Sequence, residues 1–484
     1  DLADYLFQFQ TGRVKYQVGN FSFGNLRHLI NGFPSRGITV TVPLLTRFDF
    51  SAAAMNGSLP VGYGNFFGLN RRRHQLLSGT MGVEIFAKRP GGLRLEVGGL
   101  AASVQPITGV NTGAIVNQQR SRGFSMRLVA NDQEGRFHFD GGFTRSFSIH
   151  PSGDDTLLEE SGLTKNAQYL EVRYQVLKDF SLSKTRKANL TVTFTEQNVA
   201  ASFESVGASA EADKIRYRFQ LEGSVNDISG SFSYGRDHNN LDKILPQRVQ
   251  TASLSLSLAA PAKVLIGRTK DSPWLPGLTY SFARDHGFGI AIPVAGGFVG
   301  NLSDLPNEFN TNHNFTARWQ VNKFNIAYVL GRMPIDNQQF GRELADYTTL
   351  TNAGTFGVAV NSKLDLNLIL SAQSVASREN GTIDRTYVLG PGIIWKPTNQ
   401  MTVTVNFSNI LARDVANFTH SRSTNFDASW SYSFNVGKQE LKKLAGSFSV
   451  SYSNGYQRSL DRRLPFDNLS KNQALITSMS FTLF

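Results

Sequence analysis

The stretch SWSYSF occupies residues 429–434, and the related stretch SFSVSYS occupies residues 447–453. In both stretches every second residue is large and apolar, and the residues between them are all serine. Because the side chains of a β-strand point alternately to its two faces, each stretch predicts a strand with one apolar face and one hydroxyl face. The fold depends on what lies against each of these faces.

The same alternation recurs along most of the chain. Further examples are VKYQV (14–18), ITVTV (38–42), GLRLEV (92–97), LEVRYQV (170–176), IRYRFQL (215–221), SLSLSL (253–258), LDLNL (364–368) and MTVTVNF (401–407). A two-residue period over such lengths predicts half-buried strands, and no comparable helical period is present. No window approaches the eighteen consecutive apolar residues of a transmembrane helix. The sequence therefore predicts an all-β fold.

The connections between these strands alternate in length. Short polar turns are expected at 88–92, 131–135, 225–227, 259–262, 321–323, 361–363 and 396–399. Longer polar stretches are expected at 56–73, 105–120, 151–165, 200–213, 236–248, 295–310, 333–347 and 454–472. A soluble β-sandwich or a propeller would not enforce this difference. The pattern predicts an antiparallel sheet with tight turns at one edge and long loops at the other.

Composition narrows the possible partners. Of the 484 residues, 40% are apolar and 18% are charged, which is below the usual quarter for a soluble domain. Cysteine is absent, which excludes disulfides, thiolate metal sites and covalently attached c-type haem. The formal net charge of +12 favours anionic partners.

Short turns at one edge and long loops at the other are typical of bacterial outer-membrane β-barrels. The last residues, LITSMSFTLF, resemble the C-terminal signal of that class and end in Phe484. The resemblance implies a single closed antiparallel transmembrane β-barrel in the bacterial outer membrane, in contact with outer-membrane lipid and lipopolysaccharide. It also implies short periplasmic turns and long extracellular loops. At about forty residues for each strand pair, we expect about 22–26 strands, with 24 as the best estimate.

Two parts of the chain fit this pattern less simply. Residues 1–12 are expected to be a lead-in segment or the remnant of an upstream region, and residues 13–484 to form the barrel. Residues 272–294, which contain PWLPG, are compatible with two short strands or with one strand and an inward-folded loop. Residues 287–310 are apolar, glycine-rich and poorly alternating, so they are our candidate for a loop that folds into the lumen.

Charged residues alternate with the apolar residues of several strands. A charge that faced lipid at mid-depth would cost about 2–4 kcal/mol for Arg or Lys, so these side chains are expected to face inward. The predicted pore-lining residues are Lys15, Arg94, Arg127, Arg173, Arg216, Arg218 and Arg318. Two interpretations stay open: an anion-selective wall, or a salt-bridged ladder in which Glu96, Glu171 and Glu222 neutralise neighbouring arginines.

The leading functional hypothesis is a channel that conducts or exports an anionic solute or polymer through a basic lumen lined by Ser, Thr and Arg. In kind, the chain resembles porins and exopolysaccharide-export barrels. The alternative is a structural or docking barrel of a multi-protein envelope complex, for secretion, export or electron transfer, whose lumen is plugged by a periplasmic partner protein. A third hypothesis is an outer-membrane hydrolase with a site on its loops.

The sequence contains no pattern that indicates catalysis. The basic cluster RRRH at 71–74 is interpreted as a surface patch rather than a ligand set, and neither His138 with Asp140 nor His150 with Ser152 has a third catalytic partner at a telling spacing. No glycine-rich phosphate loop stands between a strand and a helix. We therefore expect no enzyme activity, no cofactor, no metal site and no nucleic-acid partner.

Overall fold

The computed structural model describes residues 5–44, 47–57, 65–70, 74–86, 89–104, 119–149, 162–184, 186–268, 270, 272–293, 301–416, 418–436, 444–463 and 466–483. These residues form 23 strands, one short α-helix, α1 (Ala262–Leu265), and one 3₁₀ turn, η1 (Leu302–Asp304). Among them no helix is long and apolar enough to cross a membrane.

The strands belong to one sheet. The first twelve are β1 (Leu6–Thr11), β2 (Val14–Leu26), β3 (Ile30–Pro43), β4 (Phe48–Asn56), β5 (Gln75–Glu84), β6 (Leu93–Val104), β7 (Gln119–Asn131), β8 (Phe137–Ile149), β9 (Leu163–Ser183), β10 (Arg186–Val199), β11 (Lys214–Val225) and β12 (Ile228–His238). The others are β13 (Gln247–Pro261), β14 (Gly277–Ala291), β15 (Asn307–Val321), β16 (Phe324–Asn337), β17 (Tyr347–Asn361), β18 (Leu364–Ser377), β19 (Thr382–Thr398), β20 (Met401–Asp414), β21 (Thr419–Val436), β22 (Leu444–Asp461) and β23 (Phe466–Leu483).

The predicted fold class is confirmed. The chain is nearly all β, and from β1 to β10 and from β15 to β23 each strand pairs antiparallel with the next in sequence. The described residues contain 23 strands, within the expected range and one below the best estimate. Residues 6–11 form β1, which pairs with β2 along its whole length, so the division expected at residue 12 falls between two paired strands.

The alternation of connection lengths is also present. Two residues join β9 to β10, β11 to β12, β15 to β16, β17 to β18 and β19 to β20. At the other edge, which we call the long-connection edge, longer segments follow most even-numbered strands.

Four predictions about individual segments need correction or qualification. The turn expected at 259–262 is wrong, because β13 continues to Pro261 and α1 follows. Residues 454–472 are mostly strand, because β22 and β23 extend their hydrogen bonding through polar residues that resemble a loop in composition. One strand, β14, occupies most of 272–294, and both ends of 287–310 lie in strands. Residues 294–300, within that candidate loop, lie outside the described residues, as do Arg71–Arg73, His150 and Phe484.

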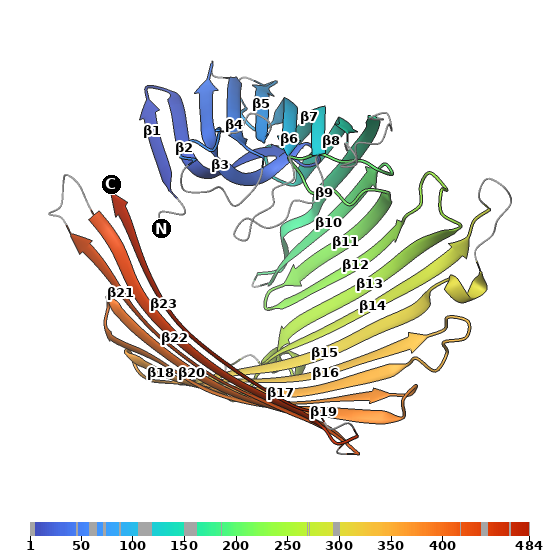
Figure 1. Cartoon of the computed structure of the whole chain (residues 1–484), viewed down its shortest axis with the longest axis vertical. Coiled ribbons are helices and arrows are strands. Elements are labelled where there is room, and N and C mark those ends of the chain that lie inside the picture. Colours follow the sequence, from blue (N-terminus) through green and yellow to red (C-terminus); the bar gives the residue numbers. More distant parts are fainter. Residues whose placement is uncertain are drawn as a thin grey trace. The chain divides into compact units, whose positions relative to one another are not determined.

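Two compact units divide the chain. Unit 1 comprises Asp1–Gly223, Ser233–Ser253 and Gly287–Leu305, and unit 2 comprises Ser224–Phe232, Leu254–His286 and Pro306–Phe484. In unit 1, β4 to β8 lie side by side, and the hairpin of β2 and β3 bends out of the sheet and passes across one face of these strands (Figure 1). In unit 2, the long strands β15 to β23 lie side by side as a single layer (Figure 1).

The β2–β3 hairpin leaves the sheet partway along its length. The pairing of β1 with β2 ends at Gly19, and the pairing of β3 with β4 begins at Gly37. Between these points, residues 20–36 pair with each other in the described ladder and with neither neighbouring strand. Gly19 has a φ of +121°, and a Cβ there would overlap the carbonyl oxygen of Tyr5. Only glycine suits this exit, because L side chains disfavour that backbone region. We call residues 20–36 the inturned arm.

The tip of the inturned arm packs on the face of β4 to β7 that it covers. Leu26, Leu29 and Ile30 are at most 1% exposed and form a cluster with Phe21, Phe23, Ala53, Met55, Leu76, Leu100 and Ala102. A Cβ at Gly98 would overlap Leu26, and one at Gly123 would lie too close to Leu29. These two glycines therefore let the leucines of the tip approach the backbone of the wall.

In unit 2, the two faces of β21 to β23 answer the question raised by SWSYSF. On one face, the hydroxyls of Ser447 and Ser480 are 2.8 Å apart, and those of Ser449 and Ser478 are 2.7 Å apart. On the other face, the ring of Trp430 contacts Tyr432 and Phe448, at centroid distances of 6.4 and 5.6 Å. One face is thus a ladder of hydroxyls and the other a ladder of aromatic rings.

Candidate functional site

The covered face of β4 to β9 carries a continuous ionic network centred on two arginines. The first, Arg94 on β6, binds three carboxylates. Its Nη2 lies 2.8 Å from Asp49 on β4, and its Nη1 lies 3.1 Å from Glu84 on β5. Its Nε donates to Glu96 over 2.7 Å. A Cβ at Gly82 would overlap the guanidinium, so this glycine opens the path from β6 across β5 to β4.

The second arginine extends the network to β9. Arg127 on β7 lies 3.1 Å from Glu96 and 2.9 Å from Asp140 on β8. The hydroxyl of Tyr169 on β9 donates to Asp140 over 2.9 Å. Glu96 is 6% exposed and joins the two arginines, so the network is a single unit of charge-assisted hydrogen bonds across six strands.

The inturned arm docks on this network through its polar side chains. Asn25 donates from Nδ2 to Glu96 over 2.9 Å. Arg27 lies 3.5 Å from Glu171 on β9, and its guanidinium stacks 4.1 Å from the ring centroid of Tyr169. The wall and the arm therefore share one set of hydrogen bonds.

Hydrogen bonds to the backbone of the arm also hold its tip. Ser205, in the β10–β11 connection, donates from its hydroxyl to the carbonyl of Leu29 over 2.6 Å. The amide of Asn31 donates to the carbonyl of Gly207 over 3.2 Å. At the base of the arm, Arg36 is 1% exposed and donates to the side chain of Asn20 and to the carbonyl of Asn65. The arm is thus held at its tip and at its base.

The network has more acids than bases. It contains five carboxylates and three guanidiniums, which gives a formal charge of −2: Asp49, Glu84, Glu96, Asp140 and Glu171 against Arg27, Arg94 and Arg127. Beside it, a polar cavity of about 310 Å³ lies between the arm and the wall. Hydroxyl, amide and ionised groups line this cavity, among them Gln17, Asn25, Thr39, Thr41, Asp49, Ser51, Thr80, Arg94 and Glu96. Such a lining can hold water and hydroxylated solutes.

The predicted pore-lining residues fall into two groups. Arg94 and Arg127 both form ion pairs with Glu96, as the interpretation of a salt-bridged ladder expected of Glu96. Arg216 also has an acidic partner, since it lies 2.7 Å from Glu211. Within the described part of the chain, Lys15, Arg173, Arg218 and Arg318 make no ion pair and are exposed. That these residues line a pore stays a prediction.

Sequence reasoning missed most of the network's other members. Asp49 and Asp140 could have been found, because they alternate with aromatic residues in FDF and FHFD. Arg27 and Asn25 carried no such signal, since their role depends on the arm leaving the sheet. Among the described residues, no group of three or more His, Cys, Asp or Glu side chains is arranged to hold a metal ion.

Comparisons with known proteins give only distant likenesses. No protein-family model and no curated protein sequence matches the chain. The siderophore receptor PirA of Pseudomonas aeruginosa matches with 12% identity over 94% of this chain and 79% of its own, at a TM-score of 0.43. A mutant of the ferric enterobactin receptor PfeA from the same organism matches with 9% identity over 99% of this chain and 79% of its own, at 0.46.

A third structure, the outer membrane protein opdK of Pseudomonas aeruginosa, matches with 10% identity over 75% of this chain and 94% of its own, at a TM-score of 0.27. These values are too low to identify a family. The nearly all-strand antiparallel architecture agrees with the resemblance to bacterial outer-membrane β-barrel proteins.

Proposed function

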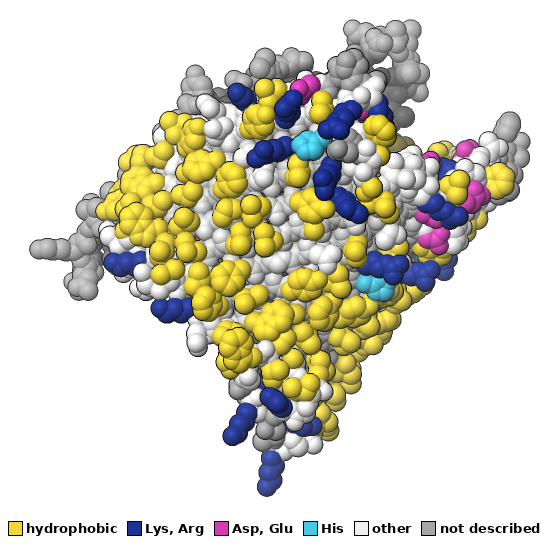
Figure 2. Space-filling model, turned by 90° about the horizontal axis from the view of Figure 1, so that it is seen from below, with side chains coloured by type: hydrophobic (Ala, Val, Ile, Leu, Met, Phe, Trp, Pro, Cys, Tyr) yellow, Lys and Arg dark blue, Asp and Glu magenta, His cyan; other side chains and the backbone are white. Residues whose placement is uncertain are grey.

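We propose that this chain is an outer-membrane β-barrel that works as a transport channel. The supporting observation is the division of its strands into two unlike faces. Opposite the ionic network of unit 1, the same strands expose Leu77, Met81, Phe124 and Met126, each more than 40% accessible. A sheet with one apolar and one polar face suits a barrel with lipid outside and water inside. Figure 2 shows hydrophobic side chains over much of one face, with Lys and Arg towards its margins.

In this proposal the sheet closes on itself, because unpaired strand edges are too costly within a bilayer. The inturned arm then narrows the lumen. It lies on the polar face of the wall and starts from the long-connection edge, so it is an inward-folded loop in β form. This arm is a different segment from the inward-folded loop expected at residues 287–310, of which residues 294–300 lie outside the described residues.

The solute in this proposal is anionic. The net charge of +12 supports this, as do Arg173, Arg218 and Arg318, which are exposed and lack an acidic partner among the described residues. The network beneath the arm, at −2, does not add to anion preference. Selectivity would therefore arise from these three arginines rather than from Arg94 and Arg127.

Reversal potentials across planar bilayers in a KCl gradient test this function. The wild-type channel should favour chloride, and R173S/R218S/R318S should lower that preference. The control K184S/R186S, at the β9–β10 turn, should retain the preference. A cation-selective channel would refute the anionic solute. Absence of conductance together with a co-purified protein would favour the docking barrel instead.

A further inference from the structure

Three arginines lie on the apolar face of β7 and β8, where the alternation of apolar and polar residues predicts no charged side chain. Arg122 pairs with Ala101 on one side and Phe147 on the other, and Arg145 pairs with Phe124. Arg120, two residues before Arg122, shares its face. All three are exposed, and none makes an ion pair with a described residue.

The position of these arginines along the strands gives their depth. Arg120 and Arg122 lie at the start of β7, and Arg145 lies close to the end of β8. Both positions are near the connections at the long-connection edge. The cost of an outward-facing arginine falls from about 2–4 kcal/mol at mid-membrane to about 0–1 kcal/mol near the interface. The cluster therefore belongs at the level of the lipid headgroups.

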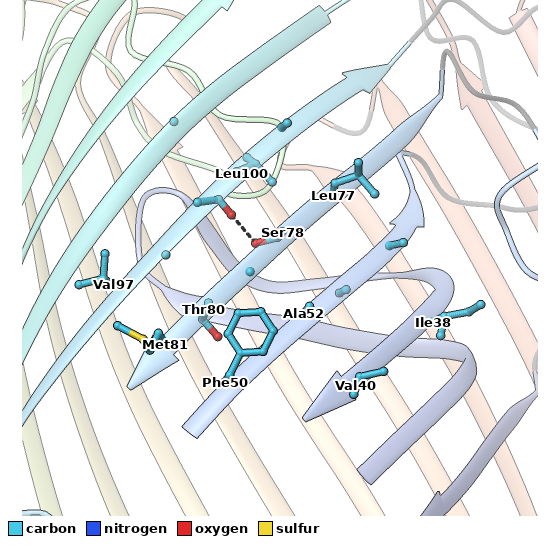
Figure 3. Close-up of a pocket in the computed structure, with 17 residues that line it drawn as sticks. Ile38, Val40, Phe50, Ala52, Leu77, Ser78, Thr80, Met81, Val97 and Leu100 are labelled. Atoms are coloured by element: carbon cyan, nitrogen blue, oxygen red, sulfur yellow. Dashed lines mark hydrogen bonds between the residues drawn. The ribbon is translucent and has the colours of Figure 1, made fainter. Parts of the chain in front are cut away.

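An apolar groove begins directly beside this cluster. It has a volume of about 1000 Å³ and lies on the apolar face of β3 to β6 (Figure 3). Small residues form its floor: Ala52, Ala54, Gly79, Gly99 and Ala101. Larger residues form its sides: Ile38, Val40, Phe50, Leu77, Met81 and Val97. A second cavity, of about 390 Å³, shares Leu77 and Ala101 with the groove and is lined by Arg120 and Arg122.

We propose that the groove and the arginine cluster bind one membrane lipid with a phosphorylated headgroup. The acyl chains lie in the groove, and the phosphate lies between Arg122 and its diagonal neighbour Arg145, with Arg120 beside them. Charge complementarity supports this occupant, because guanidinium forks suit phosphate oxygens and none of the three arginines forms an ion pair with an acidic residue in the described part of the chain. The inference rests on the proposed membrane location.

Lipid titration followed by native mass spectrometry tests the site. The purified, delipidated protein is titrated with dioleoyl phosphatidic acid, dioleoyl phosphatidylcholine or inorganic phosphate. R122S/R145S should bind phosphatidic acid at least about tenfold more weakly than wild type, since each surface arginine is worth about 1 kcal/mol towards an anionic lipid. K184S/R186S removes the same charge at the opposite edge and should bind like wild type.

G79L/G99L tests the groove separately. The nearest atoms to a Cβ at these positions are 3.8 and 3.9 Å away, so a side chain can begin there without a backbone clash and extend into the groove. This variant should weaken binding of both lipids. Unchanged binding by R122S/R145S, or binding of inorganic phosphate as tight as that of phosphatidic acid, would overturn the proposal. Flotation with phosphatidylcholine vesicles keeps the two hypotheses apart: without flotation of the wild type the membrane location fails, whereas flotation without a phosphatidic acid preference overturns only the lipid site.

Discussion

The wall formed by β4 to β9 and the wall formed by β20 to β23 follow the same strand pattern but differ in what their polar faces carry. The first has charged side chains at its centre, and the arm covers them, so Glu96 and Asp140 are at most 7% exposed. The second has serines, and Asp414 is the only buried side chain among those described on its four strands. The first wall has two layers and the second has one.

This difference shows how a polar strand face responds to a covering element. Hydroxyls can bond to water or to each other, so the serine face is stable uncovered. Carboxylates and guanidiniums beneath an arm lose water, so each needs a partner. The network on the first wall satisfies that need, and the arm contributes Asn25 and Arg27 to it.

Removing the arm should make the first wall resemble the second. Gly19 and Gly37 face each other in the ladder, so an Asn–Gly turn can replace residues 20–36. If the arm narrows the lumen, single-channel conductance should rise several-fold. Unchanged conductance in a correctly folded variant would show that the arm does not restrict the channel.

Charge substitutions on the second wall test its two faces. Val450 lies on the ring-bearing face opposite Trp430, and the adjacent Ser451 lies on the hydroxyl face. Val450→Arg should lower the free energy of unfolding by about 2–4 kcal/mol if that face meets lipid, whereas Ser451→Arg should change it little. Refolding into lipid vesicles across a urea series measures both. Equal costs would remove the distinction between the faces.

Loss of one carboxylate should lower the stability of the protein more when it lies on the first wall than when it lies on the second. Glu96→Ala leaves Arg94 and Arg127 partly buried with fewer partners, and we expect a loss of about 2–3 kcal/mol of stability, somewhat below a fully buried pair. The matched change on the second wall is Asp467→Ala, which removes an exposed ion pair with Arg458. That variant should unfold at the wild-type urea concentration. A similar loss in both variants would contradict the covered character of the first network.

The last effect concerns His28 in the turn of the arm, which lies outside the wall strands. Burial, with a contribution from Arg27, lowers the pKa of His28 to about 4. The unfolded chain has a pKa of about 6.5 and binds the proton first, so stability should fall as the pH falls from about 6.5 to about 4. Asp140 and Glu171 lie nearby, but both are engaged by arginines.

His28→Phe keeps a ring against Tyr169 and Phe203 and should flatten this pH dependence. Urea midpoints at pH 7.5 and 4.5 measure it, and His420→Phe on β21 controls for the loss of a histidine. An unchanged slope in His28→Phe would assign the pH dependence to other groups.

The strands could be predicted from the sequence because their signal is local. Alternation in SLSLSL or MTVTVNF depends on adjacent residues only. The arm could not be predicted, because residues 20–36 alternate like those of any hairpin. That the arm leaves the sheet depends on Gly19, and its packing depends on the space that Gly98 and Gly123 leave for its leucines, far along the chain. Charge pairing was equally hidden: Arg94 reaches Asp49 only because Gly82, on the strand between, has no side chain.

Strands β21, β22 and β23 are eighteen residues long. At about 3.3 Å per residue and a tilt near 45°, each rises about 40 Å, against an apolar band of about 25 Å. In the proposed orientation, their polar ends, with Asn454, Gln457 and Arg458, extend as paired strands beyond the outer surface of the bilayer. Antibodies or phages that approach this part of the surface would therefore meet a hydrogen-bonded sheet with only a short connection at its end.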